Sequence, residues 1–162
     1  MTGRALIVVL MLLLVAPGLC SAVEMEGRRA LGYYDSQAPI GARFWMSDKL
    51  GLDIGVGLIA RDTGNDTDTD FYLEGGVPIV LIAADRTNLF VRPGLATRIG
   101  ENSDSVTLTL APGVEVFFGD RFSMEVAHGI ALQFVMPDGG DTRTNFQTFS
   151  ASITALGFHF YF

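Results

Sequence analysis

Hydrophobic and polar positions alternate along most of the chain with a period of two residues. The clearest stretch is residues 50–58, where Leu, Ile or Val occupies every second position and Gly or Asp lies between them. Successive side chains of a β-strand point to opposite faces, so this period is that of a strand. No helical period competes with it after residue 22, and the pattern predicts an all-β protein.

The same alternation recurs in residues 40–46, 71–81, 89–99, 106–118, 122–134 and 146–162. Most of these predicted strands are about 10 to 15 residues long, which is long for a globular sheet and suits a tilted crossing of a bilayer. One face of each strand is apolar, whereas the other carries glycines and charges. Such faces fit a barrel with an apolar outside and a narrow polar lumen.

The connections between these strands alternate in length. Residues 47–49, 84–87 and 119–120 form short turns, whereas residues 62–70, 100–105 and 136–145 form longer polar links. Outer-membrane barrels have short periplasmic turns and longer outer loops, so the short set is predicted to be periplasmic. The strand at residues 40–46 then needs a partner before it, at about residues 25–34, with residues 35–39 as the first outer loop. The prediction is an eight-stranded antiparallel up-and-down transmembrane β-barrel.

The first 22 residues have the three parts of a secretory signal peptide. Arg4 precedes an apolar run at residues 5–16, and small residues follow near a cleavage site before Val23. Lipid attachment at Cys20 is the disfavoured alternative, because Leu19 occupies the position where a small residue is needed. The predicted organisation is therefore a signal peptide at residues 1–22 and one barrel domain at residues 23–162.

Removing residues 1–22 leaves 10 basic and 18 acidic residues, a net charge of -8, and no cysteine. A chain this acidic repels phosphate, which excludes nucleic acid as a partner. The absence of cysteine suits export through an oxidising compartment and excludes a disulfide scaffold or a thiolate metal cluster.

The signal peptide, the eight amphipathic strands, the Gly-containing hairpin at residues 44–53 and the terminal sequence Phe-His-Phe-Tyr-Phe together resemble a known family. The chain resembles the small eight-stranded outer-membrane barrels of the OmpA and OmpX type, including the opacity-like proteins, over essentially residues 23–162. This resemblance implies the cell outer membrane, with its lipid and lipopolysaccharide, as the location. It also implies a terminal signal for the barrel assembly machinery, matched here by Leu156, Phe158, Phe160 and Phe162. An ordinary edge strand is the alternative for this segment.

Charged residues on the inward face are predicted to meet in one ring, about four residues from the short turns. Turn geometry places Arg43 opposite Asp53 and Glu115 opposite Glu125. The acidic pair is costly unless an arginine reaches it. Near the outer end we expect a further pair between Glu74 and Arg98. The predicted lumen network comprises Arg43, Asp53, Glu74, Arg92, Arg98, Glu115 and Glu125. We expect it to close the lumen, with a proton path or a narrow channel as the alternative.

The sequence offers few residues for chemistry. His128 is expected on the lipid face and His159 inside, and neither has a Ser and an acid at triad spacing. Aspartates at positions 66, 68 and 70 have the spacing of calcium ligands, but Phe71 and Val77 stand at the sixth and twelfth positions of such a loop. No phosphate-binding loop is present. We therefore predict no catalytic residue, metal or cofactor.

These observations predict an integral outer-membrane barrel with a charge-plugged lumen and a structural or surface-interaction role, not an enzyme. A narrow porin-like channel for small solutes is the main alternative, and a lipid-modifying barrel enzyme is a weaker one. A soluble binder of the lipocalin kind would need an apolar lumen, whereas the predicted lumen is charged.

Overall fold

The computed structural model describes residues 23–62, 64, 67–148 and 154–162. The predicted signal peptide at residues 1–22 lies outside the described residues. Within that part of the chain, no helix is long and apolar enough to cross a membrane.

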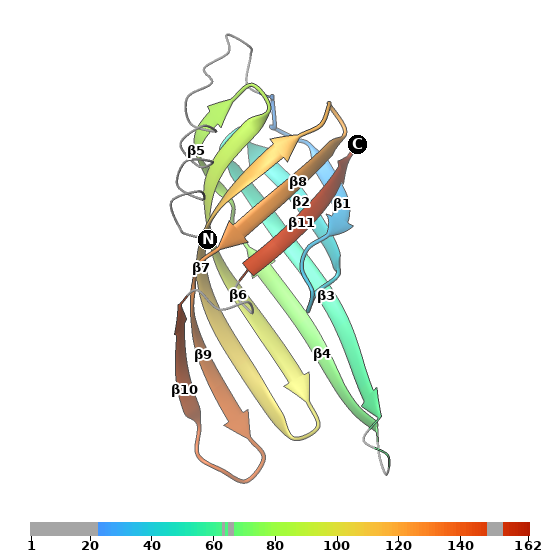
Figure 1. Ribbon diagram of the computed structural model, residues 1–162, viewed down its shortest axis with the longest axis vertical. Coiled ribbons are helices and arrows are strands. Elements are labelled where there is room, and N and C mark those ends of the chain that lie inside the picture. Colours follow the sequence, from blue (N-terminus) through green and yellow to red (C-terminus); the bar gives the residue numbers. More distant parts are fainter. Residues whose placement is uncertain (1–22, 63, 65–66, 149–153) are drawn as a thin grey trace, which may run out of the picture.

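The described residues form eleven strand segments, all paired antiparallel (Figure 1). They are β1 (Arg29–Tyr33), β2 (Ile40–Ser47), β3 (Leu50–Asp62), β4 (Thr67–Gly76), β5 (Ile79–Ala84), β6 (Thr87–Gly100), β7 (Ser103–Phe117), β8 (Phe122–His128), β9 (Ile130–Pro137), β10 (Arg143–Thr148) and β11 (Thr154–Tyr161).

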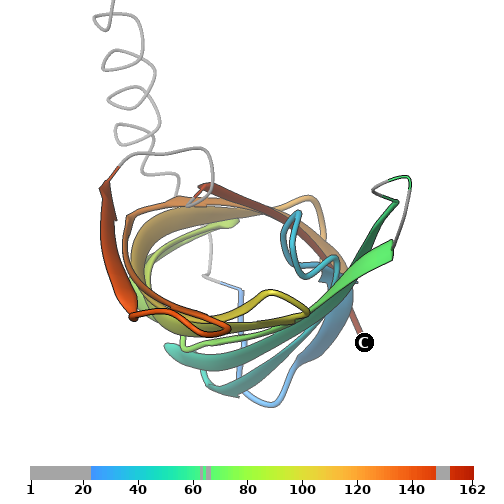
Figure 2. The same ribbon diagram turned by 90° about the horizontal axis from the view of Figure 1, so that it is seen from below.

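Three pairs of segments are halves of single barrel strands. β4 and β5 both lie between β3 and β6, and they are separated at Pro78, which cannot donate to a strand ladder. β8 and β9 both pair with β7, whereas β11 and β10 pair with β8 and β9 respectively. Because β11 also pairs with β1, the sheet closes into an antiparallel ring of eight strands (Figure 2). The predicted closed all-β barrel is confirmed.

The ring is complete only near the short turns, which we call the turn end; the opposite end is the loop end. β1 stops at Tyr33, so among the described residues β10 pairs only with β9, and residues 57–62 of β3 pair only with β4. The side chains of β10 are exposed on both faces except at Gln147, as expected for a strand with one neighbour. The loop-end half therefore contains two free strand edges.

The predicted first strand begins later than expected. The sequence placed it at about residue 25, but β1 starts at Arg29. Residues 25–28 instead cross the turn end, where the N–H of Gly27 donates to the carbonyl of Trp45 and Met25 is buried. Residues 25–28 are too few for the alternation to distinguish a strand from a segment that fills the end of the lumen.

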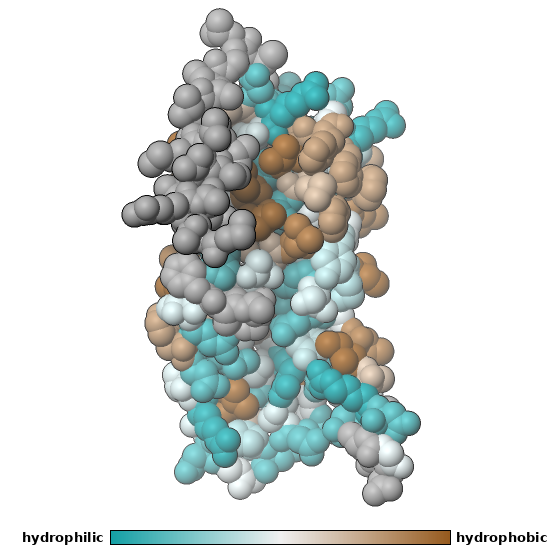
Figure 3. Space-filling model, in the orientation of Figure 1, coloured by the Kyte–Doolittle hydropathy of each residue, from teal (hydrophilic) through white to brown (hydrophobic). Residues whose placement is uncertain are grey.

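Large apolar side chains are exposed around the outside of the ring, on β2 to β11. Leu58, Leu81, Ile99, Phe146 and Phe160 are each more than half exposed. In the view of Figure 3, hydrophobic residues gather mainly over the turn-end half, and hydrophilic residues cover the loop end. The alternation thus places the apolar face outward and the small and polar face inward.

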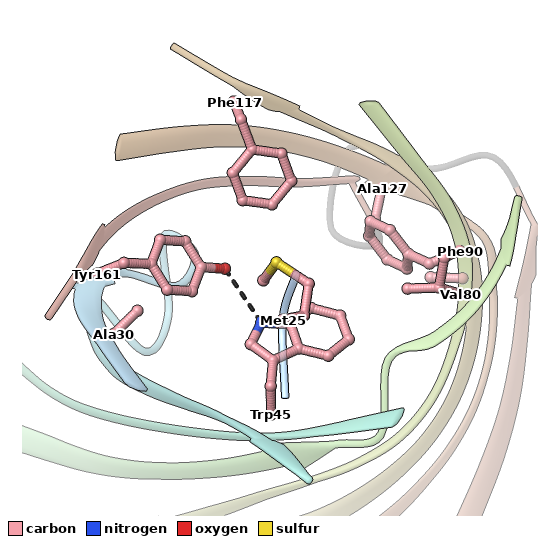
Figure 4. Packing of buried hydrophobic residues seen from close by; sticks show 9 residues of the cluster. Met25, Ala30, Trp45, Val80, Phe90, Phe117, Ala127 and Tyr161 are labelled. Atoms are coloured by element: carbon pink, nitrogen blue, oxygen red, sulfur yellow. Dashed lines mark hydrogen bonds between the residues drawn. The ribbon is translucent and has the colours of Figure 1, made fainter. Parts of the chain in front are cut away.

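The turn end of the lumen is filled by apolar and aromatic side chains. Met25 lies between Trp45, Phe117 and Tyr161, and the indole N–H of Trp45 donates to the Tyr161 hydroxyl at 3.2 Å (Figure 4). These rings lie between the mouth of the barrel at the turn end and the charged layer of the lumen, which is described in the next subsection. This plug was not predicted from the sequence, although the alternation indicates that Trp45 and Phe117 point inward.

Residues 35–39, predicted as an outer loop, fold into the lumen together with Tyr34, which was predicted to end the first strand. Tyr34 and Ala38 are buried, and the Asp35 carboxylate accepts the N–H groups of Gln37 and Ala38. Inward glycines of β2 and β3 make room for this segment. A Cβ atom at Gly57 would lie 1.8 Å from the Gln37 carbonyl oxygen, and one at Gly55 would lie 2.9 Å from the Tyr34 ring.

Gly57→Ala is expected to destabilise the protein, because the clash is with backbone and cannot be relieved by a rotamer change. Overpacking of this kind costs about 1–3 kcal/mol. Gly75→Ala is the matched control, since its nearest neighbour would be the Asp53 carbonyl oxygen at 3.7 Å. Urea unfolding in detergent measures both. Equal stability of the two variants would contradict the inward position of residues 34–39.

The N-terminal plug is tied to the β2–β3 turn by Asp48. The N–H groups of Met25 and Glu26 donate to its carboxylate at 2.8 and 3.1 Å and hold the pKa of Asp48 below its ordinary value of 3.8. A lowered folded-state pKa means that the stabilising contribution is complete above the ordinary pKa and is lost as the pH falls through the folded value.

Asp48→Asn is therefore expected to lower the urea midpoint at pH 7, and the gap from the wild type should close as the pH falls below about 4. Asp120→Asn is the control, because Asp120 is exposed in another short turn and accepts no hydrogen bond from the described residues. A gap that stays constant with pH would refute the role of the Asp48 charge.

Candidate functional site

The charged layer of the lumen consists of Arg43, Asp53, Arg92, Glu115 and Glu125. The β2–β3 hairpin places Arg43 opposite Asp53, and β7 and β8 place Glu115 opposite Glu125. β6 contributes Arg92. Each of these side chains lies on the inward face, and none is more than 5% exposed. The structure therefore brings together the five charges that the turn spacing assigned to one ring.

Arg43 is the centre of this layer. Its Nε and Nη2 atoms donate to the two Asp53 carboxylate oxygens, each at 2.6 Å, in a bidentate pair. Nη2 also donates to Glu125 at 2.7 Å, and Nη1 makes an ion-pair contact of 3.2 Å with Glu115 without hydrogen-bond alignment. One guanidinium thus holds three carboxylates from three strands.

Arg92 supplies the second positive charge. Its Nη1 atom donates to Glu125 at 2.6 Å and to Asp53 at 3.2 Å. Its guanidinium carbon lies 4.8 Å from the centre of the Tyr34 ring, within cation–π distance. Arg43 and Arg92 together relieve the repulsion between the acidic residues of this layer.

Glu115 links the charged layer to the turn-end plug. One of its oxygens accepts hydrogen bonds from the Ser123 hydroxyl at 2.5 Å and from the Tyr161 hydroxyl at 2.8 Å. Tyr161 in turn accepts from Trp45. This chain of contacts was not predictable from the sequence, because alternation determines which face a residue occupies and not which residue it meets across the barrel.

His159 lies inside the barrel near the turn end, as expected. His128 occupies one of the outward-facing positions of its strand. His159 Nε2 is 3.4 Å from Glu125, without hydrogen-bond alignment. Ser123 is opposite His159 in the strand ladder, but its hydroxyl is engaged with Glu115. His128 Nδ1 contacts the Thr154 hydroxyl at 2.6 Å. A serine, a histidine and two acids therefore lie close together without forming a nucleophile–base hydrogen bond.

Among the described residues, Glu115, Glu125 and His159 form the group that could hold a metal ion, since each has a ligand atom within 4.8 Å of the others. The Arg43 guanidinium already contacts both glutamates at this place. A metal ion would have to sit beside that cation. Arg43 thus supplies the positive charge that a metal would otherwise provide.

The expected pair between Glu74 and Arg98 is not formed. The β4–β6 register places Arg98 opposite Tyr72 and Glu74 opposite Ala96. Arg98 instead donates to the carbonyl and hydroxyl oxygens of Ser103 and lies 4.0 Å from Asp70. Glu74 interacts with the Asp35 carboxyl group. Glu74 and Arg98 lie on the same face two positions apart in the β4–β6 ladder, and each is engaged by a different partner.

The described aspartates of the β3–β4 link, Asp68 and Asp70, have different partners and do not share one site. Asp66 lies outside the described residues, and Asp70 is 7% exposed and paired with Arg61 at 2.8 Å. Asp68 lies 3.5 Å from the side-chain nitrogen of Asn102. Asp70 therefore belongs to a small ion-pair cluster at the loop end.

The four residues of the predicted assembly signal occupy alternate positions of the last strand and its end. Phe160 and Phe158 contact Phe122 at ring-centre distances of 4.9 and 6.4 Å. Phe162 is 75% exposed, and Leu156 is 43% exposed. Their side chains form part of the outward apolar face at the turn end.

Arg43→Met is expected to lower the free energy of unfolding by about 3–5 kcal/mol, because it leaves buried carboxylates without their shared cation. Arg61→Met is the control, since the Arg61 side chain is 56% exposed and its ion pair with Asp70 is at the rim. The measurement is urea unfolding followed by Trp45 fluorescence. Adding Glu125→Gln to Arg43→Met should cost less than the sum of the two single changes. Additive effects would contradict a shared network.

Comparison with known proteins gives no match, neither with a protein family nor with a curated protein nor with a solved structure.

Proposed function

We propose that the protein is an integral β-barrel of the bacterial outer membrane with a closed lumen and a structural or surface-interaction role. The observation that carries this proposal is the inversion of its two faces. Large apolar side chains are exposed around the ring, whereas the fully buried side chains inside include Arg43, Asp53, Glu115 and Glu125. In water such a surface would be a severe aggregation liability, but it matches the hydrocarbon of a bilayer.

The arrangement of aromatic residues supports an orientation in this membrane. Phe122 contacts the rings of Phe118, Phe158 and Phe160 on the outside of the turn end. Aromatic girdles mark the membrane–water interfaces of such barrels, and short turns face the periplasm. In the proposed orientation the turn end is periplasmic, the loop end faces lipopolysaccharide, and the assembly machinery binds the last strand. These features support membership of the OmpA- and OmpX-like barrels.

Two layers of side chains favour a closed lumen over a channel. The Met25 plug fills the turn end. On its loop-end side, the charged layer spans the barrel through contacts of 2.6 to 3.2 Å. An ion crossing this layer would have to displace an arginine from its carboxylates. A lipid-modifying activity has less support, since the Ser123 hydroxyl donates to Glu115 and the His128 ring contacts Thr154.

The proposal predicts that the full chain, expressed in a Gram-negative host, is recovered with the outer membrane. The unboiled protein should migrate differently from the boiled protein in gel electrophoresis, because a detergent-stable barrel resists unfolding. In planar bilayers the purified protein should give no stepwise current.

A protein that stays soluble without detergent would overturn the membrane assignment. Steady unit currents that disappear in Arg92→Gln would instead favour the narrow channel. Both tests are independent of any ligand.

A further inference from the structure

The loop-end half of the lumen contains a cavity of about 120 Å³. Its walls come from β4, β6, β7, β9, β10 and β11, and Arg92 and the inward-folded residues Tyr34, Asp35 and Gln37 also line it. A protein cavity of about 150 Å³ accommodates benzene. The space therefore suits a small organic molecule rather than a lipid chain or a folded partner.

Acidic groups outnumber basic groups around this cavity. Asp35 and Glu74 both line it, and their carboxyl groups interact with each other through a hydrogen bond. Arg92 also lines it, but its Nη1 atom is engaged with Asp53 and Glu125 in the charged layer. Two carboxyl groups in contact do not both ionise unless a positive group lies between them, so an ammonium group can replace the shared proton. Within the described residues, the cavity and the charged layer together hold five carboxyl groups and only two guanidinium groups.

The hydroxyl group of one largely buried side chain at this cavity also lacks a partner within the described residues. The Tyr34 side chain lines the cavity and is only 5% exposed, with Arg92 against its ring. Its hydroxyl makes no hydrogen bond with any described residue. Buried phenol hydroxyls normally have a hydrogen-bond partner, so this group can accept one from a bound molecule.

The rest of the wall combines small apolar and polar side chains. Ala96, Ala111 and Ala131 present methyl groups, and Thr107 and Gln133 present hydrogen-bonding groups. An aliphatic chain with a charged end would bury its carbon atoms against the alanines. The loop-end rim of the barrel is also acidic, which adds a negative electrostatic field. Its acidic residues outnumber its basic ones: Asp68, Asp70, Glu101, Asp104, Asp138 and Asp141 against Arg61, Arg98 and Arg143. Such a rim steers cations towards the cavity.

We propose that this cavity binds a small aliphatic amine, whose ammonium group lies between the Asp35 and Glu74 carboxylates and donates to the Tyr34 hydroxyl. The alanine side of the cavity contacts the aliphatic chain. This binding site goes beyond the proposed membrane role and does not depend on whether the lumen conducts. A divalent metal is the less suitable occupant, because it needs about six closely fixed oxygen ligands, which these residues do not supply.

The test is isothermal titration of the detergent-purified protein with 1,4-diaminobutane, with 1,4-butanediol as the uncharged analogue. We expect saturable binding of the diamine and none of the diol. Glu74→Gln should weaken binding about tenfold or more, as for loss of a charge-assisted hydrogen bond. Tyr34→Phe should weaken it less. Asp120→Asn, which removes an exposed charge in a short turn at the opposite end of the barrel, is the matched control and should bind like the wild type.

Heat-modifiable migration of each variant verifies that the barrel is intact. A folded wild type that binds no diamine, or a folded Glu74→Gln that binds as well as the wild type, would overturn the proposal. Saturation by calcium chloride with no response to the diamine would overturn it as well and would assign the carboxylates to a metal. None of these results would alter the proposed outer-membrane location, which fractionation and heat-modifiable migration of the wild type test separately.

Discussion

The pairing of Arg43 with three carboxylates is the interaction on which the interior of this barrel depends. Its bidentate bond to Asp53 fixes the β2–β3 hairpin, and its contacts with Glu115 and Glu125 reach the opposite wall. Charges at full burial persist only when they are paired, because desolvation penalises each of them alone. Opposite walls of the ring are therefore joined by side chains as well as by the strand ladder, and the barrel diameter must match the reach of one arginine.

The layers on either side of Arg43 are consequences of the same narrow lumen. Towards the turn end, the aromatic plug excludes water from the ion pairs and so strengthens them. Towards the loop end, inward glycines leave space that residues 34–39 enter, and Tyr34 covers Arg92. The narrow lumen is thus filled in three ways: by the inward-folded segment at the small residues, by the aromatic rings and by the ion pairs. The large apolar side chains lie on the outside of the barrel.

Sequence alone could predict which face each residue occupies and which residues meet across a tight turn. Arg43 with Asp53 and Glu115 with Glu125 follow from counting outward from short turns. The pair of Glu74 and Arg98 is not formed although both lie on one face, because Ser103 and Asp35 are the partners that these side chains meet in the folded loop end. The positions of Met25 and Tyr34 were not predictable either. Both belong to short connecting segments without periodicity, and their burial depends on space left by distant strands.

The free edges of β3 and β10 divide the barrel into parts of different stiffness. Near the turn end, every described strand has two neighbours and a packed interior, whereas β10 has one neighbour and is largely exposed on both faces. Segments with few packed neighbours open locally at lower free energy than the global transition. Amide hydrogens of β10 should exchange well before those of β7. The loop end can then change shape while the seal formed by the charges and aromatic rings stays intact.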